Sequence, residues 1–529
     1  MVVARTESPG GGWLPSRRQL VVGGAALVTT IASQGVTSSP AVAAKSYVVN
    51  PYTRTKVPTR QQLHMMNRMG CGYSRGTYAK LRKAGGVAQW FDTQLSPNKV
   101  KESARALQII DWFPDLRETP SRMWERQLTK SKGGWVYAQD LANYSMLRRV
   151  YSNRQIHENM VDFWSNHLHI SATDTYAWVH RYSYDRVIRK HALGRFDEML
   201  VAATLHPAML LFLDNWRSAK DAPNENHGRE LLELHTVGRT SGYTEDMVKD
   251  SAKILSGFTV DVRGTWGGYY RPSDHTTGPV NVLGFSAENP SIEGEQLTRE
   301  YLTFLAHHPA TSRTIARKLA VRFVSDAPSD ALVNHLAKVF RDSNTDIKTT
   351  LRALVAHSEY IASAGKKIRT PIEDFVATTR LLGVDVAAPT SDNSFARVAF
   401  RAHEGMLLFH WPRPDGPPES GAAWSSATRM LNSFRMHWRL GGGGFSNLDV
   451  TYKKPVSWLP QRRIRMDQYV DHLCRMLHGK ASTPQLLQAA VKALDIPPHE
   501  VITKDHAITR WLFVRLLAVL LDSPVHMSR

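Results

Sequence analysis

Apolar residues recur at spacings of three and four along most of this 529-residue chain, which is the periodicity of the buried face of an α-helix. Alternating apolar and polar positions, which are typical of strands, are few and short. The helical pattern covers residues 99–111, 139–150, 154–168, 195–213, 245–255, 296–306, 312–323, 330–340, 347–362, 371–382, 466–477, 484–493 and 508–521. We therefore predict a mainly α fold: a large multi-helix domain with at most a small β-hairpin at 258–271.

Long loops rich in Gly, Pro and Trp interrupt this helical pattern. Pro and Gly punctuate secondary structure, and loops longer than about a dozen residues in compact proteins are often functional. We expect the tryptophans and tyrosines of these loops to line a cleft. The loops cover residues 263–284, 384–394, 410–424 and 440–455.

The segment NENHGRELLELHTVG (224–238) is predicted to be a helix with Asn224 as its N-cap and a glycine after its last turn. At 100° per residue, Glu230 and Glu233 share one face, and Arg229 lies beside them. Three interpretations remain open: a structural ion pair between Arg229 and Glu233, a buried acid/base or metal-ligand role, and a solvated face. Leucines on both edges of the polar stripe favour burial.

A second segment, RQIHENMVDFWSNHLHI (154–170), has an apolar face that ends in a histidine. Ile156, Met160, Phe163 and His167 follow one another at helical spacing, so His167 is predicted to point inward. A hydrogen-bonded core histidine and a ligand or base are both compatible with this pattern.

These two helices supply the candidate site. The candidate catalytic residues are Glu230, Glu233, Arg229 and His167. A divalent metal bound there would have His167, Glu230 and Glu233 as ligands, because imidazole and carboxylate groups suit such cations. Further imidazoles stand where loops or helix caps begin: His206, His275 and His308.

The N-terminus has the pattern of an export signal. Arg17-Arg18 stands before an apolar stretch (20–32), and Ala-Val-Ala follows at 41–43. The apolar stretch is shorter than the roughly 20 residues that cross a bilayer. We predict a twin-arginine signal peptide over 1–43, an N-terminal extension over 44–59, and a mature protein without a transmembrane segment, located outside the cell or in the cell envelope.

The chain is basic. Lys and Arg outnumber Asp and Glu by 67 to 47, for a net charge of +20, and removal of the predicted signal leaves +18. A positive surface attracts polyanions. We find no specific nucleic-acid motif: no zinc-finger spacing, no aromatic RNA-binding signature and no basic helix leading into heptads.

Cysteine usage excludes a disulfide framework, because only Cys71 and Cys474 are present. A single bridge between them and two separate thiols both remain open.

Several motifs, read in order, resemble the bacterial family named domain of unknown function 1800. The resemblance spans about residues 60–529, and the match at 224–260 is its most specific part. It implies an exported, mostly helical protein, and it implies no reaction. The matching segments are HMMNRMGCGYS (64–74), SNRQIHENMVDFWSNHLHI (152–170), HPAMLLFLDNWRS (206–218), NENHGRELLELHTVGRTSGYTEDMVKDSAKILSGFTV (224–260), HHPATSRTIARKLAVRFVSD (307–326) and LLDSPVHMSR (520–529). The polar positions of its two strongest motifs are Asn166, His167, Asn224, Glu225, Arg229, Glu230 and Glu233.

Two functions are compatible with these observations. The first is an exported enzyme whose cleft joins the two helices, with acid/base or metal-assisted chemistry at the Glu/Arg/His cluster. The alternative is a non-catalytic envelope protein that binds an anionic cell-wall polymer or a co-exported partner protein.

Overall fold

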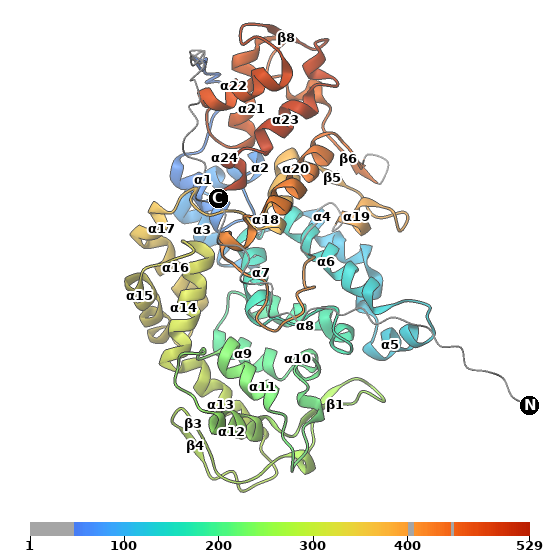
Figure 1. Ribbon diagram of the computed structural model, residues 1–529, viewed down its shortest axis with the longest axis vertical. Helices are drawn as coiled ribbons and strands as arrows, with labels where there is room; N and C mark the ends of the chain where they lie inside the picture. Colours follow the sequence, from blue (N-terminus) through green and yellow to red (C-terminus); the bar gives the residue numbers. More distant parts are fainter. Residues whose placement is uncertain (1–46, 400–406, 446–448) are drawn as a thin grey trace, which may run out of the picture. The chain divides into compact units, whose positions relative to one another are not determined.

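The chain is mainly α-helical in the computed structural model, as its apolar periodicity predicts (Figure 1). The structure describes residues 47–399, 407–445 and 449–529, and residues 47–529 form one unit. Residues 47–59 of the predicted N-terminal extension belong to this unit, and the Tyr52 amide donates a hydrogen bond to Asp471. The predicted signal peptide lies outside the described residues.

The α-helices of the described residues are listed in chain order. Those of the first half are α1 (Arg60–Arg68), α2 (Arg75–Lys83), α3 (Val87–Gln94), α4 (Ala104–Gln108), α5 (Pro120–Leu128), α6 (Gly134–Tyr151), α7 (Gln155–His167), α8 (Arg181–His191), α9 (Phe196–Thr204), α10 (Pro207–Phe212), α11 (Glu225–Glu230) and α12 (Glu245–Leu255). Those of the second half are α13 (Glu295–His307), α14 (Pro309–Phe323), α15 (Asp330–Asp342), α16 (Ile347–Ala356), α17 (Ser358–Ala362), α18 (Pro371–Leu382), α19 (Phe395–Val398), α20 (Ala427–Gly441), α21 (Met466–Leu477), α22 (Pro484–Leu494), α23 (Phe513–Leu521) and α24 (Pro524–Met527). Among all the described residues, no helix is both long and apolar enough to cross a bilayer.

Helices with clear caps agree best with the prediction. Residues 371–382 form α18, where Thr370 and Glu373 make a reciprocal capping box. Residues 245–255 form α12, which Thr244 caps. The predicted helix at 195–213 is instead two helices, α9 and α10. Pro207 begins the second, and the His206 side chain accepts a hydrogen bond from the Ala208 amide as its N-cap.

Several helices are absent from the prediction because basic and aromatic residues obscure their apolar stripes. In α8, for example, Arg181, Tyr184, Asp185 and Ile188 are the buried positions, and Ile188 is the one aliphatic residue among them. The longer helices among the others are α1, α2, α3, α5 and α20, and the short helices α19 and α24 are also absent from the prediction. The predicted helix at 99–111 is replaced by α4 and short 3₁₀ turns.

The β structure consists of short antiparallel pairs. The predicted hairpin is present: β1 (Phe258–Val260) pairs with β2 (Gly268–Tyr270), with Thr259 opposite Tyr269. The structure contains three further pairs, which are β3 (Val280–Val282) with β4 (Phe285–Ala287), β5 (Asp385–Val386) with β6 (Val450–Thr451), and β7 (Arg463–Arg465) with β8 (Val501–Thr503). Both cysteines, whose pairing was open, are free and buried.

The helix α7 lies among α6 and α8, and a buried ion-pair network joins all three. Glu158 of α7 has no exposed side-chain surface and contacts Arg148 of α6 at 2.8 Å and Arg189 of α8 at 2.7 Å. Burial alone would raise the pKa of Glu158, but the two guanidiniums outweigh it and hold the pKa at about 2. The network thus fixes the helix that carries the candidate histidine.

Replacing Glu158 by Gln is expected to lower stability by about 3 kcal/mol, because it leaves two buried guanidiniums with one partner fewer. Since the folded pKa of about 2 is below the ordinary 4.5, this contribution is present above about pH 4.5 and is lost as the pH falls toward 2. Thermal unfolding followed by circular dichroism at pH 7 and pH 3 measures both effects.

The matched control is Glu125→Gln, which removes an exposed ion pair with Arg122. Its unfolding midpoint should stay close to that of the unmodified chain. An equal shift for the two variants would contradict the assignment.

Candidate functional site

The C-terminal end of α7 places three polar side chains in three directions. Asn166 and His167 are its last residues, and His169 follows after the helix has ended at Leu168. Ile156, Met160 and Phe163 are buried on the same side as His167, which confirms that this histidine points inward. The polar residues of the sequence NHLH therefore contact different segments of the protein.

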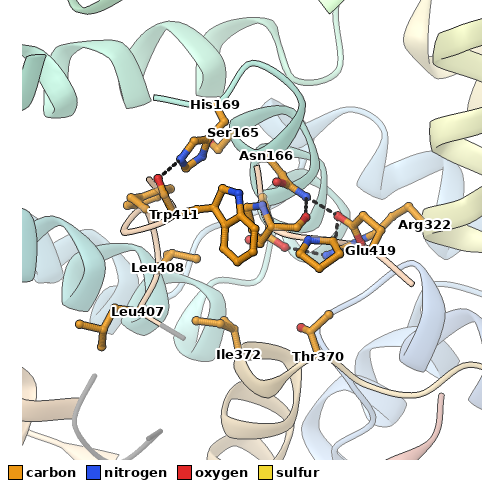
Figure 2. Close-up of a pocket in the computed structure, with 14 residues that line it drawn as sticks. Ser165, Asn166, His169, Arg322, Thr370, Ile372, Leu407, Leu408, Trp411 and Glu419 are labelled. Atoms are coloured by element: carbon orange, nitrogen blue, oxygen red, sulfur yellow. Dashed lines mark hydrogen bonds and ion pairs between the residues drawn. The ribbon is translucent and has the colours of Figure 1, made fainter. Parts of the chain in front are cut away.

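Two of these side chains hold the loop at 407–420 against α7. Asn166 Nδ2 donates to the Pro417 carbonyl and to Glu419 Oε1, each at 2.9 Å. His169 Nε2 lies 2.9 Å from the Trp411 carbonyl, so this nitrogen carries the proton and donates (Figure 2). Burial lowers the pKa of His169 to about 4, which keeps the ring neutral.

Arg322 of α14 holds the same loop from the other side. Its guanidinium contacts Glu419 at 2.8 Å (Figure 2). It also contacts Asp162 at 2.6 Å and the Asn159 side-chain oxygen at 2.8 Å. Only 3% of this side chain is exposed. Burial lowers its pKa, but Glu419, Glu373 and Asp162 outweigh burial and raise the pKa well above its ordinary value. A permanent buried charge therefore fixes the loop.

Lys318 lies one turn before Arg322 on the same helix and has different partners. Its ammonium group donates to His167 Nδ1 at 2.8 Å and to the Leu234 carbonyl at 3.1 Å. His167 Nε2 lies 3.1 Å from the His235 carbonyl, so His167 donates there and accepts from Lys318. Both carbonyls belong to the last turn of the 225–235 helix, whose negative dipole end faces these groups.

The electrostatics of this pair follow from burial. Burial lowers the pKa of Lys318 to about 8, and Asp415 and Glu419 offset only part of that effect. Burial and the nearby Lys318 lower the pKa of His167 well below 6.5, so the imidazole is neutral. A partly buried amine whose pKa is lowered to about 8 is typical of reactive lysines.

A cavity of about 460 Å³ adjoins this amine. Lys318 and His167 line it on one side, and the loop residues Trp411, Gly416 and Glu419 line the other. Two of the three ammonium hydrogens are donated within the protein, which leaves the third for a ligand. A second, smaller cavity of about 40 Å³ lies across the loop segment, next to Asn166 and Arg322 (Figure 2).

The predicted helix at 224–238 is present with a change of geometry. Asn224 caps α11 by accepting from the Asn226 amide at 2.8 Å, as predicted. After Glu230, however, the chain forms a π-helical turn, Leu231–His235, and Gly238 follows with φ of 87°. Such single turns recur at functional sites.

This π turn rearranges the polar face. The predicted pair of Arg229 with Glu233 is replaced, because the wider turn rotates Glu233 away from the α-helical position. Arg229 contacts Glu245 at 2.7 Å and Glu225 at 3.5 Å. Glu233 contacts Arg239 at 3.0 Å and accepts from the Tyr243 hydroxyl at 2.8 Å.

The structure brings together part of the predicted site. Glu230 is half-buried, and burial, with Glu233 and Asp415 nearby, raises its pKa. Asp415 lines the cavity of Lys318, whereas Glu230 is not among its lining residues. His167 is bound by Lys318 instead of a carboxylate. Among the described residues, His167, Glu230 and Glu233 do not form a group of three ligand atoms within 4.8 Å.

Lys318 and Arg322 were missed from the sequence, although their positions contain a signal. In α14, Ile315, Leu319 and Phe323 define the buried face, and the helical angle of 100° per residue places Arg322 within that face and Lys318 at its edge. Two cations within or beside an apolar stripe need partners inside the protein, so the pattern predicts a polar site. The neighbouring His308 caps α14, as its place before a proline predicts.

A family model described as "Protein of unknown function (DUF1800)" matches residues 64–528, which is nearly the full length. No curated protein and no solved structure matches the chain. The function has to be inferred from the site itself.

Replacing Gly416 by Ala is expected to release the loop from α7. Gly416 has φ of 68°, and an added methyl group would overlap the side-chain and backbone oxygens of Asn166. Hydrogen–deuterium exchange should rise in residues 407–420, together with faster proteolysis of that loop.

The control is Gly365→Ala, where φ is 77° but no atom lies within 4 Å of the added methyl group. It carries the same backbone strain without the clash. Unchanged exchange at 407–420 in Gly416→Ala would show that Asn166 does not hold the loop.

Proposed function

Because the chain belongs to the DUF1800 family, whose description names no reaction, we propose its function from the chemistry of its own cavity. We propose an enzyme that acts on a small anionic carbonyl compound through the amine of Lys318. The observation that carries this proposal is a partly buried amine that lines a cavity of about 460 Å³ and whose hydrogen-bond partners are a neutral imidazole and a carbonyl.

In the described part of the chain no carboxylate lies at hydrogen-bonding distance from this amine, and in this proposal that makes the amine reactive. A carboxylate partner would hold the proton on Lys318, whereas His167 and the Leu234 carbonyl stabilise the ammonium form less. Near pH 8 about half of the Lys318 amine is then neutral and nucleophilic. His167 is a positioning residue in this proposal, because it fixes the amine and is itself fixed by the His235 carbonyl.

The proposed step is reversible imine formation. The neutral amine nitrogen attacks the carbonyl carbon, the carbon–oxygen double bond is replaced by a carbon–nitrogen double bond, and the oxygen leaves as water with the two amine hydrogens. Arg317 and Arg413 line the cavity and suit an anionic group on the substrate.

Labelling with glyoxylate and cyanoborohydride tests this proposal on the folded, full-length protein. Lys318 should be modified with a midpoint near pH 8, since its neutral form increases as the pH rises through that value. At pH 8 its labelling should exceed that of the exposed Lys338 by about tenfold or more, because an ordinary lysine titrates near pH 10.4. Peptide mass spectrometry reads both sites.

Two controls accompany the labelling. Lys318→Arg should remove the adduct from its peptide, and the unfolded chain should label Lys318 and Lys338 alike. No adduct on Lys318 in the folded protein would contradict the proposal. In that case salt-sensitive binding of an anionic polymer would favour the non-catalytic alternative, which the net charge of +20 supports.

We also propose export by the twin-arginine route, on the basis of Arg17-Arg18, the apolar stretch at 20–32 and Ala-Val-Ala at 41–43. The secreted protein should begin at Ala44, as read by N-terminal sequencing. Replacing Arg17 and Arg18 by Lys should retain the full-length chain inside the cell. Export of that variant at the original rate would argue against the route.

A further inference from the structure

A second cluster of metal-type side chains lies outside the cavity of Lys318. It consists of Asp374 of α18, His437 of α20 and His526 of α24, three helices that Figure 1 shows near one another. Their ligand atoms all lie within 4.8 Å of one another. Asp374 Oδ1 is 3.1 Å from His437 Nε2 and 3.5 Å from His526 Nε2. One carboxylate oxygen thus faces two imidazole nitrogens.

We propose that Asp374, His437 and His526 bind one divalent transition-metal cation, such as zinc. Two imidazole nitrogens and one carboxylate oxygen are ligands that zinc and iron accept in proteins. The side chains of Asp374 and His437 have no exposed surface, and that of His526 is 3% exposed. Such a closed position is typical of a structural metal, which here would join α18 to α20 and α24.

The outer partners of the cluster support this assignment. Asp522 Oδ1 lies 2.7 Å from His437 Nδ1, so that nitrogen donates to the carboxylate and the ring turns Nε2 toward Asp374. A histidine held by a carboxylate on its far nitrogen is the arrangement that orients metal-binding imidazoles.

The second oxygen of Asp374 is already engaged. The Ser433 hydroxyl donates to Asp374 Oδ2 at 2.7 Å, and Arg429 lies 3.5 Å from the same oxygen. These contacts leave Oδ1 for the cation. The Thr378 hydroxyl is 2.8 Å from His526 Nε2, which places one more oxygen beside the three ligands.

The alternative is a metal-free network in which His437 carries two protons and bridges Asp374 and Asp522. The metal content of the protein distinguishes the metal-bound cluster from this metal-free network. This inference is independent of Lys318, because a metal here would be structural and labelling of Lys318 does not report on it.

Metal analysis of the purified full-length chain, by inductively coupled plasma mass spectrometry after dialysis without chelator, is the first test. We expect about one equivalent of metal per chain. Removal by 1,10-phenanthroline should lower the thermal unfolding midpoint, and added zinc should restore it. Substoichiometric metal together with no response of the midpoint to zinc would overturn the proposal.

Variants locate the site. His437→Gln and His526→Gln should lose the metal, whereas His472→Gln should keep it, because that buried histidine bonds to Thr55 instead. Asp522→Asn should weaken metal affinity by about 10- to 100-fold, as expected for an orienting partner. Retention of one equivalent by both His437→Gln and His526→Gln would also overturn the proposal.

The visible spectrum of the cobalt-loaded, unmodified protein covers the case in which these variants do not fold. Bands of a four- or five-coordinate cobalt ion with nitrogen and oxygen ligands would support the site. A spectrum of free aqueous cobalt would contradict it.

Discussion

The guanidinium of Arg322 is the constraint on which the candidate site depends. It is buried and always charged, so it requires carboxylate partners inside the protein, and it obtains them from α7 and from Glu419 of the loop. The loop at 407–420 is therefore bound where it covers one side of the cavity. The same requirement aligns α14 with α7 and so determines where Lys318 meets His167.

Arg322 and Lys318 lie one turn apart on α14, but their surroundings shift their pKa values in opposite directions. Carboxylates surround Arg322 and raise its pKa, whereas Lys318 meets a neutral ring and a carbonyl, and burial lowers its pKa to about 8. The helix positions both side chains, but the neighbouring segments determine that Arg322 stays charged and that Lys318 can lose its proton. The α7 motif supplies partners for both, through Asn159 and Asp162 for Arg322 and through His167 for Lys318.

Much of the fold can be predicted from apolar spacing, because a helix that packs on a core shows its buried face in the sequence. Capped helices such as α12 and α18 agree residue by residue. The inward direction of His167 is also predictable. The partners of Glu230 and Glu233 cannot be predicted in this way, since α-helical angles do not anticipate a π turn at 231–235. Lys318, Asp374 and His437 find their partners far along the chain, and single-helix geometry cannot identify such pairs.

The π turn has a consequence for how this chain can vary in length. A π turn holds more residues per turn than an α-helix, and here the turn ends with the Leu234 and His235 carbonyls facing Lys318 and His167. Deleting one residue from 231–235 would let ordinary α-helical geometry continue. It would also take one residue out of the turn whose last two carbonyls meet these donors. Relatives with this site should therefore tolerate exchanges of side chains within 231–235 far better than a shortened backbone.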